Sequence, residues 1–290
     1  MSRKPRTSFV EPEPFESYRK RFEDHFVMDR SDDGILEVRM HTDGGPAVWG
    51  LELHKAVGQM IETVGADREN QVLILTATGD EWLGQIDDES FGIIEDDRER
   101  FERDTYDLYY YDGLRLLEKL IWDIDIPSIG VLNGPGFHSE FPLLCDLTIC
   151  ADDTWLYDPH LAGGLVPGDG QLLVLQHLLG PKRANYAAYM LEQIGAQQLL
   201  DWGVVNEVHP RADLMPRARE IAARMLAIDP TVRRISNHIL KRPWRRALTD
   251  DLEFHLAHEL WGVMVHRPKH ESSTLRELQD GAKPHPGGTE

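Results

Sequence analysis

The sequence is poor in cysteine. Only Cys145 and Cys150 occur among the 290 residues, and both lie in the apolar run 143–151. Two cysteines are too few for a disulfide framework, and thiols in an apolar run are usually buried. We therefore predict two buried free thiols in a protein of a reducing compartment.

The sequence also lacks a long apolar run. Its opening segment, MSRKPRTSFVEPEPFESYRK, is charged and contains no apolar stretch of the kind found in secretion signals. No stretch approaches the roughly 18–20 consecutive apolar residues that a membrane-spanning helix needs. We expect a cytoplasmic protein with no membrane partner.

Positive charge is scarce. Lysine and arginine total 31 residues against 50 aspartates and glutamates, so the net charge is −19. This charge repels the phosphates of nucleic acids and anionic membrane surfaces, and neither is expected as a partner. It also disfavours a polyanionic substrate such as a coenzyme A thioester, unless a local basic patch offsets it.

Common cofactor motifs are missing as well. There is no G-x-x-x-x-G-K-[ST] phosphate loop, no G-x-S-x-G nucleophile elbow and no dinucleotide-binding fingerprint. Among the 13 histidines, His255 and His258 have helical ligand spacing with Glu259, but no H-E-x-x-H pattern occurs. We therefore expect neither a metal nor an organic cofactor.

What the sequence does contain is an alternation of strands and helices. Ile35–Met40 alternates as a strand does, residues 51–64 form an amphipathic helical pattern, and Gln71–Ala77 is typical of a buried strand. This order predicts a βαβ-like unit of an α/β fold. Further strands are predicted at 128–132, 143–151 and 204–208, and further helices at about 112–122, 216–228, 231–241 and 248–265.

The composition divides the chain into four regions. Residues 1–26, with several prolines and many charges, are predicted to be an N-terminal extension, and 27–215 a core domain. Residues 216–267 are predicted to be a C-terminal helical region, and 268–290 a disordered polar tail. Within the core, residues 79–112 are rich in acidic and aromatic side chains. We expect a solvated helix or loop there, with a lid over the site as the alternative.

Residues 133–170, NGPGFHSEFPLLCDLTICADDTWLYDPHLAGGLVPGDG, resemble the crotonase (enoyl-CoA hydratase/isomerase) superfamily. Residues 73–91, 194–208 and 217–226 agree with the same family in the same order. The resemblance implies an α/β fold built as a spiral of ββα units. It also implies a C-terminal helical oligomerisation region and assembly as a homotrimer or a dimer of trimers.

Two features of the family members that act on thioesters are absent here. Where those enzymes place glycines whose N–H groups form an oxyanion hole, residues 138–140 are His-Ser-Glu, and 84–87 are Gly-Gln-Ile-Asp. The positions of the two acid–base glutamates of the hydratases hold Pro142 and His160. Because proline cannot exchange a proton, hydratase chemistry is not expected.

The replacements resemble one branch of the superfamily, the β-diketone hydrolases typified by 6-oxocamphor hydrolase. That branch has a tryptophan after the first strand, a histidine on the next helix and a histidine in the NGP loop. It adds a histidine–aspartate pair around the PGDG turn and a glutamate in the C-terminal helix. The matching residues here are Trp49, His54, His138, His160 with Asp169, and Glu259.

The resemblance implies roles that suit the chemistry of such a cleavage. Hydrolysis of a β-diketone needs a base for water, a donor for the enolate oxygen and an acid for the enolate carbon. Histidine suits both proton transfers because its ordinary pKa is ~6.5. We assign water activation to His160 paired with Asp169. We assign His138 as the acid toward the carbanion or as a donor to the attacked carbonyl, and the Trp49 indole N–H to the enolate oxygen.

Several assignments stay open. The roles of His138 and His160 could be exchanged. His54 is placed with the substrate-binding residues, although a satisfied core histidine is an equal alternative. Glu259 is placed with the catalytic residues, although a salt bridge between subunits is an equal alternative. Glu140 is a further candidate.

We predict a cofactor-independent hydrolase that opens a cyclic or bicyclic β-diketone by a retro-Claisen reaction to give a keto acid. One alternative is a hydrolase, lyase or isomerase of coenzyme A thioesters with rebuilt acid–base residues. Another is a non-catalytic crotonase homologue that serves as an assembly or binding subunit.

Overall fold

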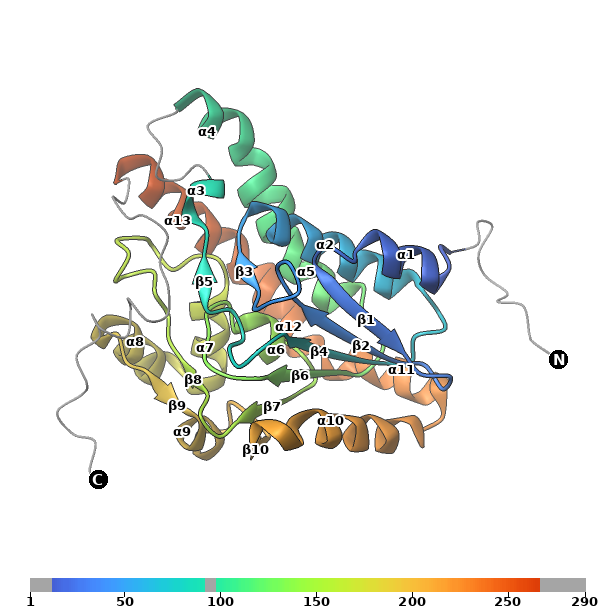
Figure 1. Cartoon of the computed structure of the whole chain (residues 1–290). Coiled ribbons are helices and arrows are strands. Elements are labelled where there is room, and N and C mark those ends of the chain that lie inside the picture. Colours follow the sequence, from blue (N-terminus) through green and yellow to red (C-terminus); the bar gives the residue numbers. More distant parts are fainter. Residues whose placement is uncertain (1–11, 92–97, 267–290) are drawn as a thin grey trace.

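A twisted six-stranded sheet organises the chain (Figure 1), whose computed structural model describes residues 12–91 and 98–266. The strand order is β1-β2-β4-β6-β7-β10, with β1 antiparallel to β2 and the other neighbours parallel. The predicted disordered tail lies outside the described residues. The strands are β1 Phe26–Arg30, β2 Ile35–Met40, β4 Val72–Ala77, β6 Ser128–Leu132, β7 Leu147–Ala151 and β10 Glu207–His209.

Two small sheets and a set of helices complete the described part of the chain. The small sheets pair β3 (Val48–Trp49) with β5 (Gln85–Ile86), and β8 (Trp155–Leu156) with β9 (Ile194–Gly195). The helices before the C-terminal region are α1 Phe15–Arg21, α2 Leu51–Ala66, α3 Asp88–Phe91, α4 Arg98–Thr105, α5 Arg115–Trp122, α6 Glu140–Leu143, α7 Gln171–Leu179, α8 Pro181–Met190 and α9 Ala196–Asp201. Those that follow are α10 Arg211–Leu226, α11 Pro230–Leu240, α12 Arg242–Ala247 and α13 Glu253–Val265, and two segments are π-helical, η1 Tyr106–Leu114 and η2 Leu248–Leu252.

Both faces of the sheet are covered, which explains why its central strands are apolar throughout. All six residues of β4 are buried. On one face, Val72, Ile74 and Ile129 pack against Leu214 and Ala218 of α10. On the other face α2 and α5 pack together over the sheet (Figure 1). The unbroken apolar runs that predicted β4 and β6 thus reflect burial on two sides.

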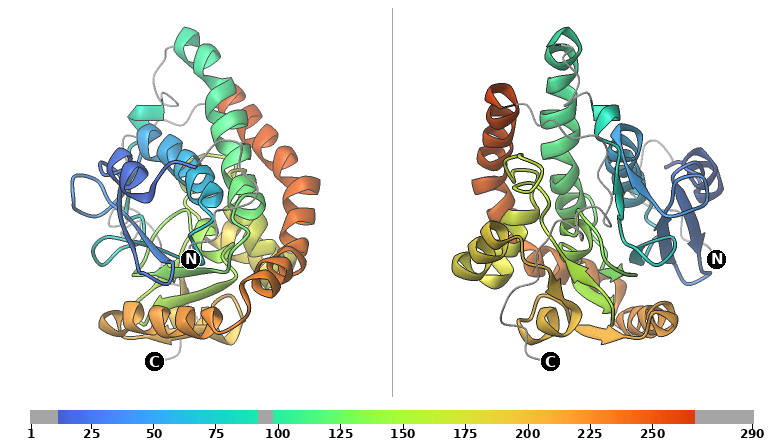
Figure 2. Two further views of the ribbon diagram at one scale, coloured as in Figure 1. Left: turned by 90° about the vertical axis from the view of Figure 1, so that its right-hand side faces the viewer. Right: turned by 60° about the vertical axis from the view of Figure 1, so that its left-hand side comes forward.

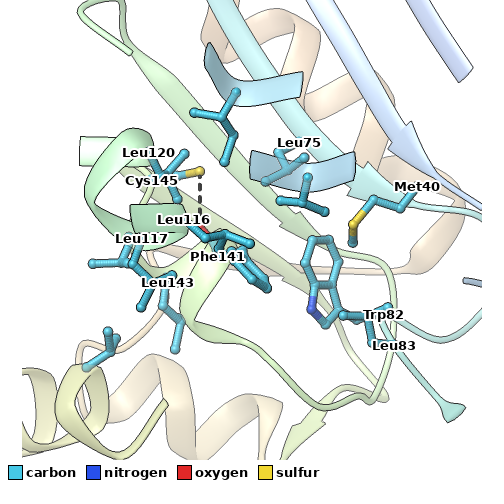
Figure 3. Close-up of a cluster of buried hydrophobic side chains, with 14 of the residues drawn as sticks. Met40, Leu75, Trp82, Leu83, Leu116, Leu117, Leu120, Phe141, Leu143 and Cys145 are labelled. Atoms are coloured by element: carbon cyan, nitrogen blue, oxygen red, sulfur yellow. Dashed lines mark hydrogen bonds between the residues drawn. The ribbon is translucent and has the colours of Figure 1, made fainter. Parts of the chain in front are cut away.

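The main hydrophobic core packs against the loop that carries His138, one of the predicted site residues. In Figure 3, Trp82 and Phe141 lie near Met40, Leu75 and the leucines of α5. Trp82 and Phe141 are buried, and the Trp82 Nε1–H donates a hydrogen bond of 3.1 Å to the carbonyl of His138. The core therefore holds the backbone of a site residue directly.

The elements predicted from the sequence agree with the structure in position, but several differ in extent. The strand predicted at 143–151 begins only at Leu147, after α6, and the strand predicted at 204–208 is limited to Glu207–His209. The predicted helix at 112–122 is divided, because η1 continues as far as Leu114 and only then does α5 begin. The predicted helix at 216–228 begins earlier, at Arg211, with Pro216 inside it. Cys145 and Cys150 are both buried free thiols, as predicted. No helix among the described residues is long and apolar enough to cross a membrane.

The N-terminal segment differs from the extension expected as far as residue 26. Phe15, Tyr18, Phe22 and Phe26 are all buried, and the first three follow one face of α1 and its end. The Tyr18 hydroxyl donates a 2.9 Å hydrogen bond to Asp67, which also forms a 2.6 Å ion pair with Arg30. Pro12 and Pro14 precede this apolar face, and the charged residues of α1 are exposed, so neither interrupts it.

This anchoring predicts a large effect of Tyr18→Ala. Removal of a fully buried aromatic ring should lower the free energy of unfolding by about 3 kcal/mol, measured by urea denaturation. The control is Tyr18→Phe, which keeps the ring, loses the hydrogen bond to Asp67 and should cost about 1 kcal/mol. A loss below about 1 kcal/mol for Tyr18→Ala would show that the N-terminal segment does not belong to the cooperative core.

Candidate active site

The loop after β6 places His138 beside the core. His138 has a φ of 48°, in the left-handed region that few residues other than glycine adopt. The hydrogen bond from Trp82 holds its carbonyl, and the Phe137 N–H bonds to the Leu83 carbonyl at 2.9 Å. The surrounding structure therefore imposes this backbone shape, which aims the imidazole at the two carboxylates described next.

His138 contacts two carboxylates through one ring nitrogen. Its Nδ1 lies 2.9 Å from Glu140 Oε1 and 3.2 Å from Asp169 Oδ2. Glu140 is buried, and its second oxygen makes no hydrogen bond in the described part of the chain. The other ring nitrogen, Nε2, has no protein partner among the described residues and remains available for a proton transfer.

His160 also lies between two carboxylates, the predicted Asp169 and, in addition, Asp158. Its Nδ1 lies 2.7 Å from Asp158 Oδ1, which also accepts a 3.1 Å hydrogen bond from the His160 backbone N–H. Its Nε2 is 3.4 Å from Asp169 Oδ2. Asp158, not Asp169, is therefore the carboxylate that orients this imidazole. The Asp-Pro-His order is the signal in the sequence, because an aspartate often bonds to the backbone two residues on.

Asp169 joins the two histidines because its turn is pressed against α13. A Cβ at Gly168 would lie 2.4 Å from the His255 carbonyl oxygen and 2.6 Å from Glu259 Cβ, so only glycine fits there. Asp169 Oδ1 accepts a 3.3 Å hydrogen bond from the Gln171 N–H at the start of α7. The second oxygen of Asp169 is left to face His138 and His160.

Trp49 and His54 form an aromatic wall beside this cluster. The Trp49 ring lies 4.5 Å from the His138 ring, 5.3 Å from His54 and 5.4 Å from Phe141, measured between centroids. The Trp49 indole N–H donates no hydrogen bond to the described residues and is free to bind a substrate oxygen. Burial, followed by the nearby His138, lowers the pKa of His54 to about 3. His54 is therefore a neutral imidazole at pH 7 and is suited to contact with substrate rather than to acid catalysis.

Glu259 completes the set, and Tyr109 adds a residue that the sequence did not indicate. Both side chains are buried, and Glu259 Oε2 and the Tyr109 hydroxyl oxygen have no hydrogen-bond partner in the described part of the chain. Burial, reinforced by Asp169, raises the pKa of Glu259 to about 8. Glu259 is thus mostly protonated at neutral pH. The predicted site residues all lie in one cluster, and Asp158, Glu140 and Tyr109 join them.

The carboxylates govern the charge of the two central histidines. Burial alone would lower the pKa of His160, but Asp169 and Asp158 more than offset it, so the pKa lies well above its ordinary value. For His138, Glu140 and Asp169 likewise outweigh burial and raise the pKa. Asp169 keeps a lowered pKa, because the two histidines outweigh the effect of burial. The cluster therefore favours a charged carboxylate at Asp169 and protonated rings at His138 and His160.

The same cluster offers ligand atoms for a cation. One atom each of His138, Glu140 and Asp169 lies within 4.8 Å of the others. Metal binding would require His138 to release its proton, since only the neutral imidazole is a ligand. The carboxylate contacts that favour the protonated ring therefore compete with metal binding at this place.

Comparison with known proteins agrees with the fold. Residues 32–272 match the enoyl-CoA hydratase/isomerase family. A carnitinyl-CoA dehydratase from Escherichia coli O157:H7 is 31% identical over 150 residues, 51% of this chain and 56% of that protein. The match thus spans about half the length of that curated relative.

Two solved structures are similar over most of the chain. A β-diketone hydrolase from the cyanobacterium Anabaena sp. PCC 7120, bound to (S)-3-oxocyclohexyl acetic acid, has a TM-score of 0.81 at 32% identity and covers 88% of this chain and 99% of its own. An enoyl-CoA hydratase/isomerase from Mycobacterium paratuberculosis has a TM-score of 0.75 at 19% identity, covering 89% and 98%. The predicted crotonase fold, with its helical C-terminal region, is confirmed.

The raised pKa of Glu259 predicts a pH-dependent effect of Glu259→Gln on stability. The folded chain binds this proton more tightly than the unfolded chain, so wild-type stability falls as pH rises from about 4.5 to about 8. Glutamine cannot ionise. The free energy of unfolding of Glu259→Gln, relative to that of wild type, should therefore increase by on the order of 4 kcal/mol between pH 5 and pH 9, measured by urea denaturation.

Glu253→Gln, at an exposed position of the same helix, is the matched control. Its stability relative to wild type should stay within about 0.5 kcal/mol across this range. If the difference in unfolding free energy between Glu259→Gln and wild type is also independent of pH, Glu259 is ionised in the folded protein at neutral pH.

Proposed function

The chain belongs to the enoyl-CoA hydratase/isomerase family, and we propose that it is a hydrolase that cleaves a carbon–carbon bond of a cyclic or bicyclic β-diketone. The observation that carries this proposal is the partly buried Asp169 carboxylate between His138 and His160, with Trp49 beside one of them. Such an arrangement supplies two proton-transfer groups and a hydrogen-bond donor in one place. The similarity to the Anabaena β-diketone hydrolase supports the same conclusion.

The first step is addition of water to one carbonyl. After His160 has lost its proton, Nε2 accepts a proton from water while the water oxygen bonds to the carbonyl carbon. The carbonyl π electrons move onto the carbonyl oxygen. Asp158 holds the opposite nitrogen at 2.7 Å, so it fixes the tautomer and stabilises the imidazolium that forms.

The second step breaks the carbon–carbon bond. The oxyanion reforms a carbonyl, and the electron pair of the broken bond becomes an enolate on the second carbonyl, where the Trp49 indole N–H donates to the oxygen. His138 Nε2 then gives its proton to the enolate carbon, which yields a ring-opened keto acid. Asp169 lies 3.2 Å from His138 and 3.4 Å from His160, so it stabilises the positive charge as this charge moves from His138 to His160. Exchange with solvent after product release restores the proton on His138 Nε2 and removes the one on His160 Nε2.

Hydration of a thioester fits the residues less well. The position of one hydratase glutamate is Pro142, which has no proton to exchange, and Pro142 is buried in α6. The similarity to a carnitinyl-CoA dehydratase and the match to the enoyl-CoA hydratase/isomerase family favour a coenzyme A substrate. That alternative predicts saturable binding of coenzyme A, and the β-diketone proposal does not need it.

The first prediction concerns the reaction itself. Incubation with a panel of non-enolisable bicyclic β-diketones in H₂¹⁸O, without coenzyme A or metal, should give a product heavier by one water, with ¹⁸O in a new carboxylate. His138→Ala and His160→Ala should each lower kcat by about 100-fold or more, because each removes a proton-transfer group. Mass spectrometry follows the product. Absence of turnover across the panel, together with binding of coenzyme A, would replace this proposal with the thioester alternative.

A second prediction concerns Asp158. Because His160 must be neutral to accept a proton and its pKa is raised, wild-type kcat/KM should increase with pH through an apparent pKa above 6.5. Asp158→Asn removes one of the carboxylates that raise this pKa. The rise should therefore shift to lower pH, and the maximal rate should fall about tenfold or more because the ring loses its orientation.

The matched control is Glu207→Gln, which removes the partner of His209 in a 2.7 Å histidine–carboxylate pair formed by β10. This variant should leave the pH profile unchanged. An Asp158→Asn profile identical to that of wild type would remove His160 as the base and transfer that role to His138.

A further inference from the structure

Two buried oxygen atoms near Asp169 have no partner, although burial of an unpaired polar group is costly. The Tyr109 hydroxyl and Glu259 Oε2 both lack a hydrogen bond in the described part of the chain, and each residue is 7% exposed. Hydroxyls of this kind are retained where another molecule supplies the missing partner. The mechanism above uses neither of them.

The two residues face each other across neighbouring helices. Figure 2 (left) shows η1 descending beside α13 while α13 runs the opposite way, and the two segments are in contact. One contact between them is at Gly113, where a Cβ would lie 3.6 Å from the Leu256 side chain. Tyr109 lies four residues before Gly113, and Glu259 lies three residues after Leu256. Because the two segments are antiparallel, both residues lie about one turn away from this contact in the same direction, so Tyr109 is opposite Glu259. The charge of Glu259 acts directly on the Tyr109 hydroxyl, in agreement with this placement.

The pair also borders the reacting groups. The Glu259 Cβ lies against Gly168, next to Asp169 in sequence, and Asp169 acts on both Glu259 and Tyr109 electrostatically. Trp49 lies on the His138 side of the cluster, where the enolate is expected to form. The Tyr109 and Glu259 pair is therefore placed to bind an oxygen other than the one assigned to Trp49.

We propose that the Tyr109 hydroxyl and the Glu259 carboxyl form an oxyanion hole for the carbonyl that water attacks, an inference that rests on the proposed hydrolysis of a β-diketone. Both groups donate to the same carbonyl oxygen. As the water oxygen bonds to carbon, the π electrons move to that oxygen, and its negative charge is met by two O–H donors. When the carbon–carbon bond breaks, the same donors hold the new carboxyl group.

The charge states suit this task. Burial raises the pKa of Tyr109 well above its ordinary value, and Glu259, with a pKa of about 8, is mostly neutral at pH 7. Both groups therefore donate hydrogen bonds without carrying a charge that would repel an anion. A phenol beside a neutral carboxylic acid is an established way to stabilise an oxyanion. Here it takes over from the backbone N–H groups that the family places at residues 138–140.

Tyr109→Phe tests the first donor. It keeps the ring and removes only the hydroxyl, so kcat for the β-diketone should fall about 100-fold while KM changes less than about threefold. Tyr110→Phe, at the next and exposed position of η1, is the control and should keep wild-type kinetics.

The pH profile of kcat tests the second donor. Above pH 8 the Glu259 carboxyl loses its proton and becomes an anion that repels the oxyanion, so wild-type kcat should fall there. Glu259→Gln keeps an N–H donor at every pH, so its kcat should show no fall above pH 8. The groups that act on Glu259 are Asp169, His160, His138 and Asp158, and all of them remain in this variant.

The outcomes separate this inference from the proposed function. Turnover by wild type with unchanged kcat in Tyr109→Phe would overturn the oxyanion hole and leave the hydrolase proposal intact. A fall above pH 8 that persists in Glu259→Gln would overturn the part of Glu259. Absence of turnover by wild type itself would overturn the hydrolase proposal, and the oxyanion hole with it. A lower unfolding midpoint in a variant, with kcat per folded molecule unchanged, would also count against the inference.

Discussion

The site depends on one partly buried carboxylate that contacts two imidazoles. Asp169 is held by the helix start at Gln171 on one oxygen and faces His138 and His160 with the other. Removal of either histidine would leave a partly buried charge with half of its compensation, which is costly in a region of low dielectric. The loop after β6 and the turn before α7, which packs on α13, together bring the three side chains into contact.

Much of the fold could be predicted, because its elements are those with strong local signals. The central strands are buried on two faces and are therefore continuous apolar runs, and α2 has an apolar stripe of helical period. The short strands of the two small sheets have two residues each and no detectable period. Helix α1 was missed because its buried face lies among prolines and charges, which are the usual marks of an extension.

The candidate site residues named from the sequence lie together in the structure, but the contacts among them were only partly predicted. The resemblance identified the residues that stand at the positions of the family's catalytic groups. These residues differ in type from their neighbours in the sequence. It could not place Asp158 on the Nδ1 side of His160, because the order of contacts around a ring depends on how the loop turns. Tyr109 was missed for another reason. It lies in a π-helical segment, where the side chains do not follow the period used to separate buried from exposed positions.

The left-handed backbone at His138 bears on how such a site can arise. A loop that is built for glycine already holds its backbone at positive φ, and a histidine placed there costs about 1 kcal/mol without moving the chain. From this backbone the imidazole reaches Glu140 and Asp169, while the hydrogen bonds of Trp82 and Phe137 hold the loop without involving the side chain. A change of reaction is then reachable through single replacements on an unaltered scaffold, each of which yields a folded protein on which selection can act.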